Sequence, residues 1–125
     1  MKLLYAEDEE TMAEAVVDIL TYHNYLVETV ADGAEALAYA QNGDYDGIIL
    51  DVMMPKMDGW ETCREIRQYS KVPIIMLTAR GGENDELRGF ELGVDEYIAK
   101  PFSPKILVAR VEAVSYTHLR AHETD

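Results

Sequence analysis

The sequence predicts an α/β fold in which five parallel strands form a doubly wound sheet of order 2-1-3-4-5, with five helices on its two faces. Five short apolar runs alternate with longer amphipathic stretches along the 125-residue chain. This alternation is typical of a parallel sheet covered by helices. Because crossovers between parallel strands are right-handed, few ways of winding such a sheet are possible.

Each apolar run is short and is bounded by residues that favour turns, so we interpret the runs as strands. They are residues 3–6, 26–30, 48–50, 74–77 and 97–99, the second being interrupted by Glu28 and Thr29. Three of the runs look buried on both faces, as expected for the inner strands of a parallel sheet.

Between the runs, apolar residues recur at helical spacing, so that each stretch has one apolar stripe. The stripes are Met12, Val16, Ile19 and Leu20; Ala34, Leu37 and Ala38; Trp60, Cys63 and Ile66; Leu87 and Phe90; and Leu107, Val111 and Val114. Boundary signals agree with these helices. They are Asp32-Gly33 and Asn42-Gly43 around the second helix, Gly93 after the fourth and Ser103-Pro104 before the fifth.

Composition and charge exclude several classes of protein. The chain has 24 acidic and 11 strongly basic residues, which gives a formal net charge of −13. An acidic surface repels a phosphate backbone, so we expect this chain itself to bind no nucleic acid and no membrane. Cys63 is the single cysteine, which excludes an internal disulfide. No run approaches the about 20 apolar residues of a membrane span, and we expect a cytoplasmic protein.

We expect one domain over residues 1–114, because the length fits a single core and no linker interrupts this range. The apolar spacing of residues 115–125 (SYTHLRAHETD) does not continue the fifth helix cleanly. We interpret this tail as vector-derived or read-through sequence. His118 and His122 have a spacing that can bind a metal on a helix, but we interpret them as histidines of a frayed tail.

Side chains that can ligate a metal or take part in a reaction follow four of the five predicted strands. They are Glu7 and Asp8, Asp51, Thr78, and Lys100. The carboxyl ends of parallel strands share one edge, and ligands bind there at the switch point between strands 1 and 3. Clustered carboxylates repel one another unless a cation such as Mg²⁺, which prefers oxygen ligands, compensates for them. With a lysine and a threonine to contact phosphoryl oxygens, the set suits phosphoryl transfer to a carboxylate.

Four ordered motifs make residues 1–114 resemble the receiver domain of two-component response regulators, which has a flavodoxin-like fold. They are the acidic pair Glu7-Asp8, residues 48–59 (IILDVMMPKMDG), residues 73–80 (PIIMLTAR) and residues 93–102 (GVDEYIAKPF). The sequences of residues 88–93 (RGFELG) and 100–104 (KPFSP) resemble those of the OmpR/PhoB-like subfamily. Proteins of this subfamily usually carry a DNA-binding domain after the receiver, so we expect the chain to be the receiver part of a transcriptional regulator.

The resemblance implies a phosphorylation-dependent signalling switch that is not a conventional enzyme. Asp51 would accept a phosphoryl group from the phosphohistidine of a sensor histidine kinase, and Thr78 and Lys100 would contact the phosphoryl oxygens. Tyr97 would be the switch aromatic, turning inward as Thr78 moves toward the phosphate. The bond between Lys100 and Pro101 would be cis.

The same resemblance implies Mg²⁺ as the cofactor. Asp8, Asp51 and the backbone carbonyl of Met53 would ligate it, and Glu7 would act through a water molecule. Hydrolysis of the phosphoryl group would be slow, because neither Met53 nor Arg80 has a carboxylate or amide that can orient the attacking water.

The resemblance also implies that phosphorylation produces a homodimer through the fourth helix, the fifth strand and the fifth helix. We expect this dimer to be weak, because Ile106 stands where the subfamily has an acidic partner for an ion pair. The expected interface is an apolar patch of Leu87, Phe90 and Ala109, with Asp95 or Glu96 paired with Arg110.

Two other interpretations of the same fold differ in class. A flavodoxin-like domain that binds a nucleotide or flavin phosphate needs a Ser/Thr/Gly-rich loop after the first strand, where this chain has residues 7–10 (EDEE). A receiver-like scaffold that is never phosphorylated would be expected to lack one of Asp8, Asp51, Thr78 or Lys100, all of which are present. Treatment with a small phosphodonor separates the three possibilities.

Overall fold

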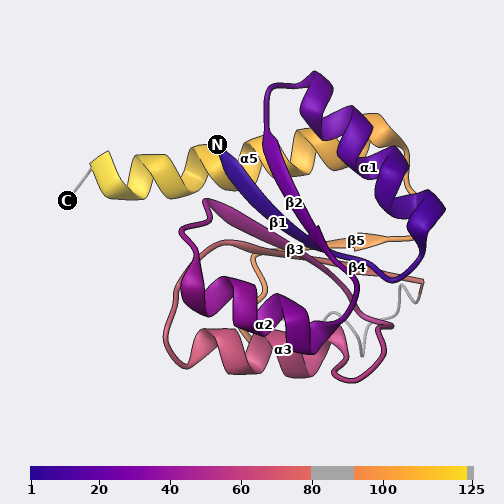
Figure 1. Ribbon diagram of the computed structural model, residues 1–125. Coiled ribbons are helices and arrows are strands. Elements are labelled where there is room, and N and C mark those ends of the chain that lie inside the picture. Colours follow the sequence, from indigo (N-terminus) through magenta and orange to yellow (C-terminus); the bar gives the residue numbers. More distant parts are fainter. Residues whose placement is uncertain (80–91, 124–125) are drawn as a thin grey trace.

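Five parallel strands form one sheet of order β2-β1-β3-β4-β5 in the computed structural model, which confirms the predicted topology (Figure 1). The structure describes residues 1–79 and 92–123, and side chains as far as residue 114. Each strand begins and ends within one residue of its predicted run. The strands are β1 (Lys2–Ala6), β2 (Leu26–Val30), β3 (Gly47–Asp51), β4 (Ile74–Thr78) and β5 (Glu96–Ala99).

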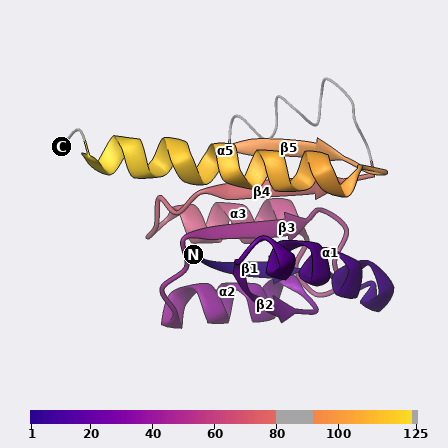
Figure 2. The ribbon, with the colours of Figure 1, turned by 90° about the horizontal axis from the view of Figure 1, so that it is seen from above.

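The described helices cover both faces of the sheet (Figures 1 and 2). Helices α1 (Glu10–Tyr22) and α5 (Pro104–Glu123) lie on one face, and α2 (Gly33–Asn42) and α3 (Gly59–Arg67) lie on the other. The helix predicted around Leu87 and Phe90 lies outside the described residues. Within the described part of the chain, no helix is both long and apolar enough to cross a membrane.

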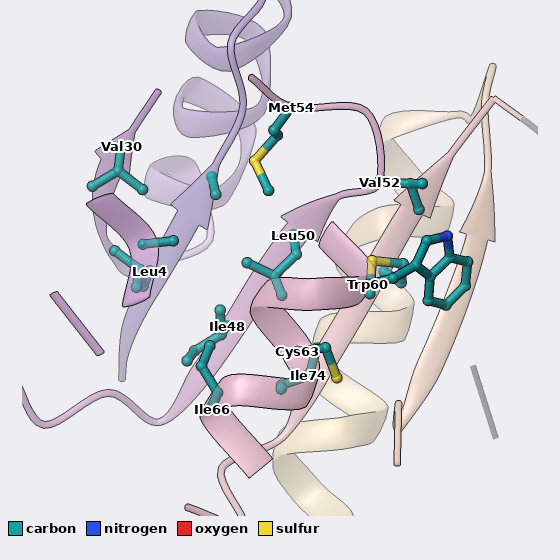
Figure 3. Close-up of a cluster of buried hydrophobic side chains, with 13 residues drawn as sticks. Leu4, Val30, Ile48, Leu50, Val52, Met54, Trp60, Cys63, Ile66 and Ile74 are labelled. Carbon is teal, nitrogen blue, oxygen red and sulfur yellow. The ribbon is translucent and has the colours of Figure 1, made fainter. Parts of the chain in front are cut away.

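Side chains that alternate along the inner strands divide the core into two clusters, one on each face of the sheet. Leu4, Ile48 and Leu50 pack with Trp60 and Cys63 on the side of α2 and α3 (Figure 3). The opposite cluster contains Leu3, Tyr5, Ile49, Leu77 and Ile98, together with Val16 and Leu20 of α1 and Leu107 and Val111 of α5. Strands β3 and β4 are buried along their whole length, and β1 is buried from Leu3 to Ala6, which makes three buried strands, as predicted.

Side-chain caps begin two of the helices where the sequence predicts them. Asp32 precedes α2, and its Oδ1 accepts a hydrogen bond from the Glu35 N–H at 2.8 Å. Ser103 precedes α5, and its Oγ accepts one from the Ile106 N–H at 3.3 Å. Gly93 has φ of +78°, a conformation that favours glycine.

Helix α2 buries the predicted face only in part, because Leu37 packs against the core as predicted but its two alanine neighbours do not. Ala34 and Ala38 are exposed, whereas Gly33 and Ala36 are buried. The reason is the close approach of α2 to the loop before α3, because a Cβ at Gly33 would lie 2.1 Å from the Met57 carbonyl oxygen. Only the glycine-bearing face of α2 can come this close.

Helix α5 continues beyond residue 114 to Glu123, although the apolar spacing of residues 115–125 does not continue its stripe cleanly. Residues 105–123 contain neither glycine nor proline, and nothing in the backbone therefore interrupts the helix.

Arg67, the last residue of α3, joins that helix to the start of β5. Its Nε and Nη2 donate to the Gly93 carbonyl at 3.0 and 2.8 Å, and its Nη1 donates to the Val72 carbonyl at 2.7 Å. Nη2 also lies 2.9 Å from Asp95 Oδ2, which accepts a hydrogen bond from the Ile74 N–H at 2.8 Å. We call this group of hydrogen bonds the Arg67 network. It fixes the amino end of β5 against α3 and β4.

Replacement of Arg67 with Ala should destabilise the fold. Hydrogen bonds from a charged donor contribute about 1.5–3 kcal/mol each, and the change leaves the carbonyls of Ser70, Val72 and Gly93, as well as Asp95, without this donor, so we expect a loss of about 2–3 kcal/mol. Urea unfolding measures the effect. Arg64→Ala, which removes an exposed arginine from the same helix, is the matched control. Equal stabilities of the two variants would contradict the role of the Arg67 network.

Candidate functional site

The parallel sheet brings four of the predicted site residues to one edge. Glu7 follows β1, Asp51 ends β3, Thr78 ends β4 and Lys100 follows β5. The register aligns these positions, since Asp51 pairs with Leu77, and Thr78 pairs with Ala99. The edge therefore lies where the sequence places a binding site.

The amino group of Lys100 lies between two buried carboxylates. Its Nζ donates to Asp51 Oδ2 and, at 3.2 Å, to Glu7 Oε1. Glu7 and Asp51 are only 5% and 3% exposed, so water does little to stabilise their charges. The lysine provides the compensating charge in this conformation.

Glu7 has further donors around its carboxylate. The Tyr5 hydroxyl donates to Oε1 at 3.1 Å, and the Glu9 N–H donates to Oε2 at 3.3 Å. Burial and the neighbouring Asp51 raise the pKa of Glu7 to about 7, although Lys100 opposes this shift. Burial and Glu7 also raise the pKa of Tyr5 well above its ordinary value, so its hydroxyl remains a donor.

Lys100 is held as an ammonium by its surroundings. Burial alone would lower the pKa of Lys100, but hydrogen bonds and attraction to Asp51 and Glu7 raise it above the ordinary value. The bond between Lys100 and Pro101 is cis, as predicted.

The loop after β3 wraps around Asp51. The Met53 N–H donates to Asp51 Oδ1 at 2.9 Å, and the Gly59 N–H donates to the Val52 carbonyl at 2.9 Å. A Cβ at Gly59 would lie 2.5 Å from the Asp51 carbonyl oxygen, so glycine permits α3 to begin directly against the site. The Met53 side chain is exposed.

The donor set of this edge fits a hard divalent cation. Glu7 and Asp51 offer carboxylate oxygens at this edge, and the exposed Asp8 follows Glu7 in the chain. Within residues 1–79 and 92–114, no three His, Cys, Asp or Glu side chains are arranged to hold a metal. Mg²⁺ does not require such a cage, because it is usually bound through one or two carboxylates and keeps several waters.

Thr78 and Tyr97 lie on the α3 side of the sheet. Thr78 is buried, and it shares a face of β4 with Met76, which pairs with Tyr97 in the register. The Tyr97 ring is half-buried and stacks on Trp60, with ring centroids 6.0 Å apart and an interplanar angle of 22°.

Sequence reasoning missed two contacts of this site. It treated Trp60 as a core residue, which is confirmed, but not as a partner of Tyr97. It also gave no role to Tyr5, although strand alternation places Tyr5 and Glu7 on the same face of β1. That signal could have identified Tyr5.

The expected interface residues have contacts within the chain. Glu96 Oε2 lies 3.4 Å from Arg110 Nη1, and Asp95 belongs to the Arg67 network. Ala109 is exposed on α5. Arg80, Leu87 and Phe90 lie outside the described residues.

The chain matches known proteins along most of its length. The family model described as response regulator receiver domain matches residues 3–112. A probable transcriptional regulator, ycf27, of Guillardia theta is 49% identical over 90% of this chain and 44% of its own length. Transcriptional regulatory protein ResD of Bacillus subtilis is 45% identical over 90% of this chain and 47% of its own length. The chain thus spans about half the length of the curated relatives it matches.

Solved structures agree with these relatives. The receiver domain of Francisella response regulator 1452 has a TM-score of 0.90 and 30% identity, covering 94% of this chain and 98% of that one. The chemotaxis protein CheY4 of Vibrio cholerae has a TM-score of 0.85 and 38% identity, covering 90% of this chain and 97% of that one.

Replacement of Glu7 with Gln should change how stability depends on pH. The folded chain binds the Glu7 proton more tightly than the unfolded chain does, since the pKa is about 7 rather than 4.5. The free energy of unfolding therefore falls as the pH rises from about 4.5 to about 7. The Gln variant should be more stable than the wild type at pH 8, by on the order of 1–3 kcal/mol.

Urea unfolding between pH 5 and pH 8, with a chelator present, measures this difference. Glu9→Gln makes the same change at an exposed carboxylate and serves as the control. A stability difference between Glu7→Gln and the wild type that stays constant over this range would contradict the assignment.

Proposed function

The chain belongs to the response regulator receiver domain family, and from this membership and the site we propose that it accepts a phosphoryl group on Asp51. Domains of this family are signalling domains. We propose that this one is a cytoplasmic switch, phosphorylated by a sensor histidine kinase, and the receiver part of a transcriptional regulator. The observation that carries the proposal is the buried Asp51 carboxylate at the end of β3, paired with Lys100.

The chemistry is a transfer between two side chains. An Asp51 carboxylate oxygen attacks the phosphorus of the kinase phosphohistidine, an O–P bond forms, and the P–N bond breaks with its electron pair returning to the imidazole. Water later attacks the same phosphorus, which restores the carboxylate and releases inorganic phosphate. The Met53 side chain has no carboxylate or amide that can orient that water, so hydrolysis is slow.

Lys100 and Thr78 act on the transferred group. The Lys100 ammonium compensates for the Asp51 charge before transfer, and afterwards its Nζ donates to a phosphoryl oxygen. The Thr78 hydroxyl donates to another. Glu7, Asp8, Asp51 and the Met53 carbonyl would hold Mg²⁺. When bound, Mg²⁺ neutralises negative charge on the carboxylates and the phosphoryl oxygens.

Replacement of Asp51 with Asn should abolish phosphorylation, because an amide is not a competent nucleophile. Intact-protein mass after incubation with acetyl phosphate and Mg²⁺ measures the addition of one phosphoryl group, which should also disappear with excess chelator. Asp58→Asn is the matched control, since Asp58 caps α3 in the same loop and asparagine caps a helix equally well. Labelling that survives in Asp51→Asn, or is absent from the wild type, would overturn the proposal.

We also propose that phosphorylation produces a weak homodimer through β5 and α5. Within one chain, Asp95 already pairs with Arg67, and Glu96 already pairs with Arg110. A dimer that uses these residues therefore replaces ion pairs within the chain by ion pairs between chains and gains little from them. Exposed ion pairs contribute only about 0–1 kcal/mol each, which is consistent with weak association.

Sedimentation with and without beryllofluoride and Mg²⁺ tests the dimer. We expect a monomer without the phosphoryl mimic and a concentration-dependent dimer with it, which Arg110→Ala should weaken about two- to fivefold. Lys105→Ala removes another exposed base of α5 and is the control. A tight dimer without beryllofluoride, or a strict monomer with it, would exclude this interface.

A further inference from the structure

The stack of Tyr97 on Trp60 joins two segments of the chain that each lie close to Asp51. Trp60 lies in the first turn of α3 and is 4% exposed, and its indole extends from the core toward β5 (Figure 3). Tyr97 lies in β5 with its ring nearly parallel to that indole, at a centroid distance of 6.0 Å. Aromatic pairs at this separation contribute more than their buried area alone.

On one side of the stack, Trp60 is held next to the loop that follows β3. The preceding residue, Gly59, donates to the Val52 carbonyl at 2.9 Å, and a Cβ at this position would lie 2.5 Å from the Asp51 carbonyl oxygen. The indole therefore has little freedom to move relative to Asp51.

The Tyr97 end of the stack is connected to the same carboxylate by a second route. Lys100 follows Tyr97 by three residues, and its Nζ donates to Asp51 Oδ2. Tyr97 also shares a sheet face with the buried Thr78, whose neighbour in the register is Ala99. A movement of Thr78 or Lys100 toward a phosphoryl group therefore changes the space beside the Tyr97 ring.

We propose that Trp60 is a positioning residue for Tyr97, and that their stack stabilises the conformation in which Lys100 bonds directly to Asp51. This inference rests on the proposed phosphorylation of Asp51. An interaction shifts an equilibrium only if it is stronger in one state than in the other. If the movement of Thr78 or Lys100 toward a phosphoryl group turns the Tyr97 ring off the indole, the stack is lost, so the stack opposes that movement.

The first test uses Trp60 as the reporter, because it is the single tryptophan of the chain. Beryllofluoride with Mg²⁺ should change its fluorescence in the wild type and in Tyr97→Phe, which keeps the stack. The change should be largely lost in Tyr97→Leu. A fluorescence change that is absent from the wild type, or unaltered in Tyr97→Leu, would overturn the inference.

The second test measures the affinity for beryllofluoride by calorimetry. Trp60→Leu should bind about two- to tenfold more tightly than the wild type, whereas Trp60→Phe should stay close to it. Adding Tyr97→Leu to Trp60→Leu should have little further effect, because both changes remove the same contact. Unchanged or weaker binding by Trp60→Leu would overturn the inference.

Intact-protein mass after acetyl phosphate treatment distinguishes a failure of this inference from a failure of the proposed function. If the variants and the wild type accept a phosphoryl group but show no coupling between Trp60 and Tyr97, the inference fails alone. If the wild type accepts none, the proposed function fails. Thermal unfolding of each variant shows that it remains folded.

Discussion

The site depends on one electrostatic constraint, which is that two carboxylates are buried side by side at the end of a parallel sheet. Glu7 and Asp51 cannot both remain charged there without a cation, and Lys100 supplies it from the end of the edge strand β5, beyond β4. The raised pKa of Glu7 shows that this compensation is incomplete. A site with uncompensated negative charge is suited to attract a divalent cation, and Lys100, which already bonds to Asp51, lies close to the oxygen on which we propose the transfer.

The fold produces this constraint through the parallel arrangement of its strands. The carboxyl ends of these strands lie at one edge of the sheet. The two core clusters fix where each strand ends relative to its neighbours, through residues such as Leu50 and Leu77. Close packing of glycine then brings the helices against the loops, as at Gly59, where α3 starts within van der Waals contact of the Asp51 backbone. The precision of the site thus depends on apolar packing far from the charged groups.

Much of this arrangement could be predicted from the sequence, because it depends on local patterns. The strand positions follow from the apolar runs. The edge at which Asp51 and Lys100 lie together follows from the parallel arrangement of the strands. The buried face of α2 could not be predicted, since it is set by the contact of Gly33 with a distant loop. For the same reason, the sequence did not show that Asp95 bonds to Arg67, because a side chain's choice between partners depends on tertiary distances.

Among the strands that the structure describes, β5 pairs with β4 alone and lies at an edge of the sheet. An edge strand is ordinarily among the first to open in native-state fluctuations. Here it is fastened at both ends, by the Arg67 network at its start and by Lys100 after its last residue. Opening it requires the separation of charges at both ends together with the release of α3 from Gly93. The backbone amides of β5 would therefore exchange slowly and together with those of α3, as one cooperative unit, although the strand itself is short and half-exposed.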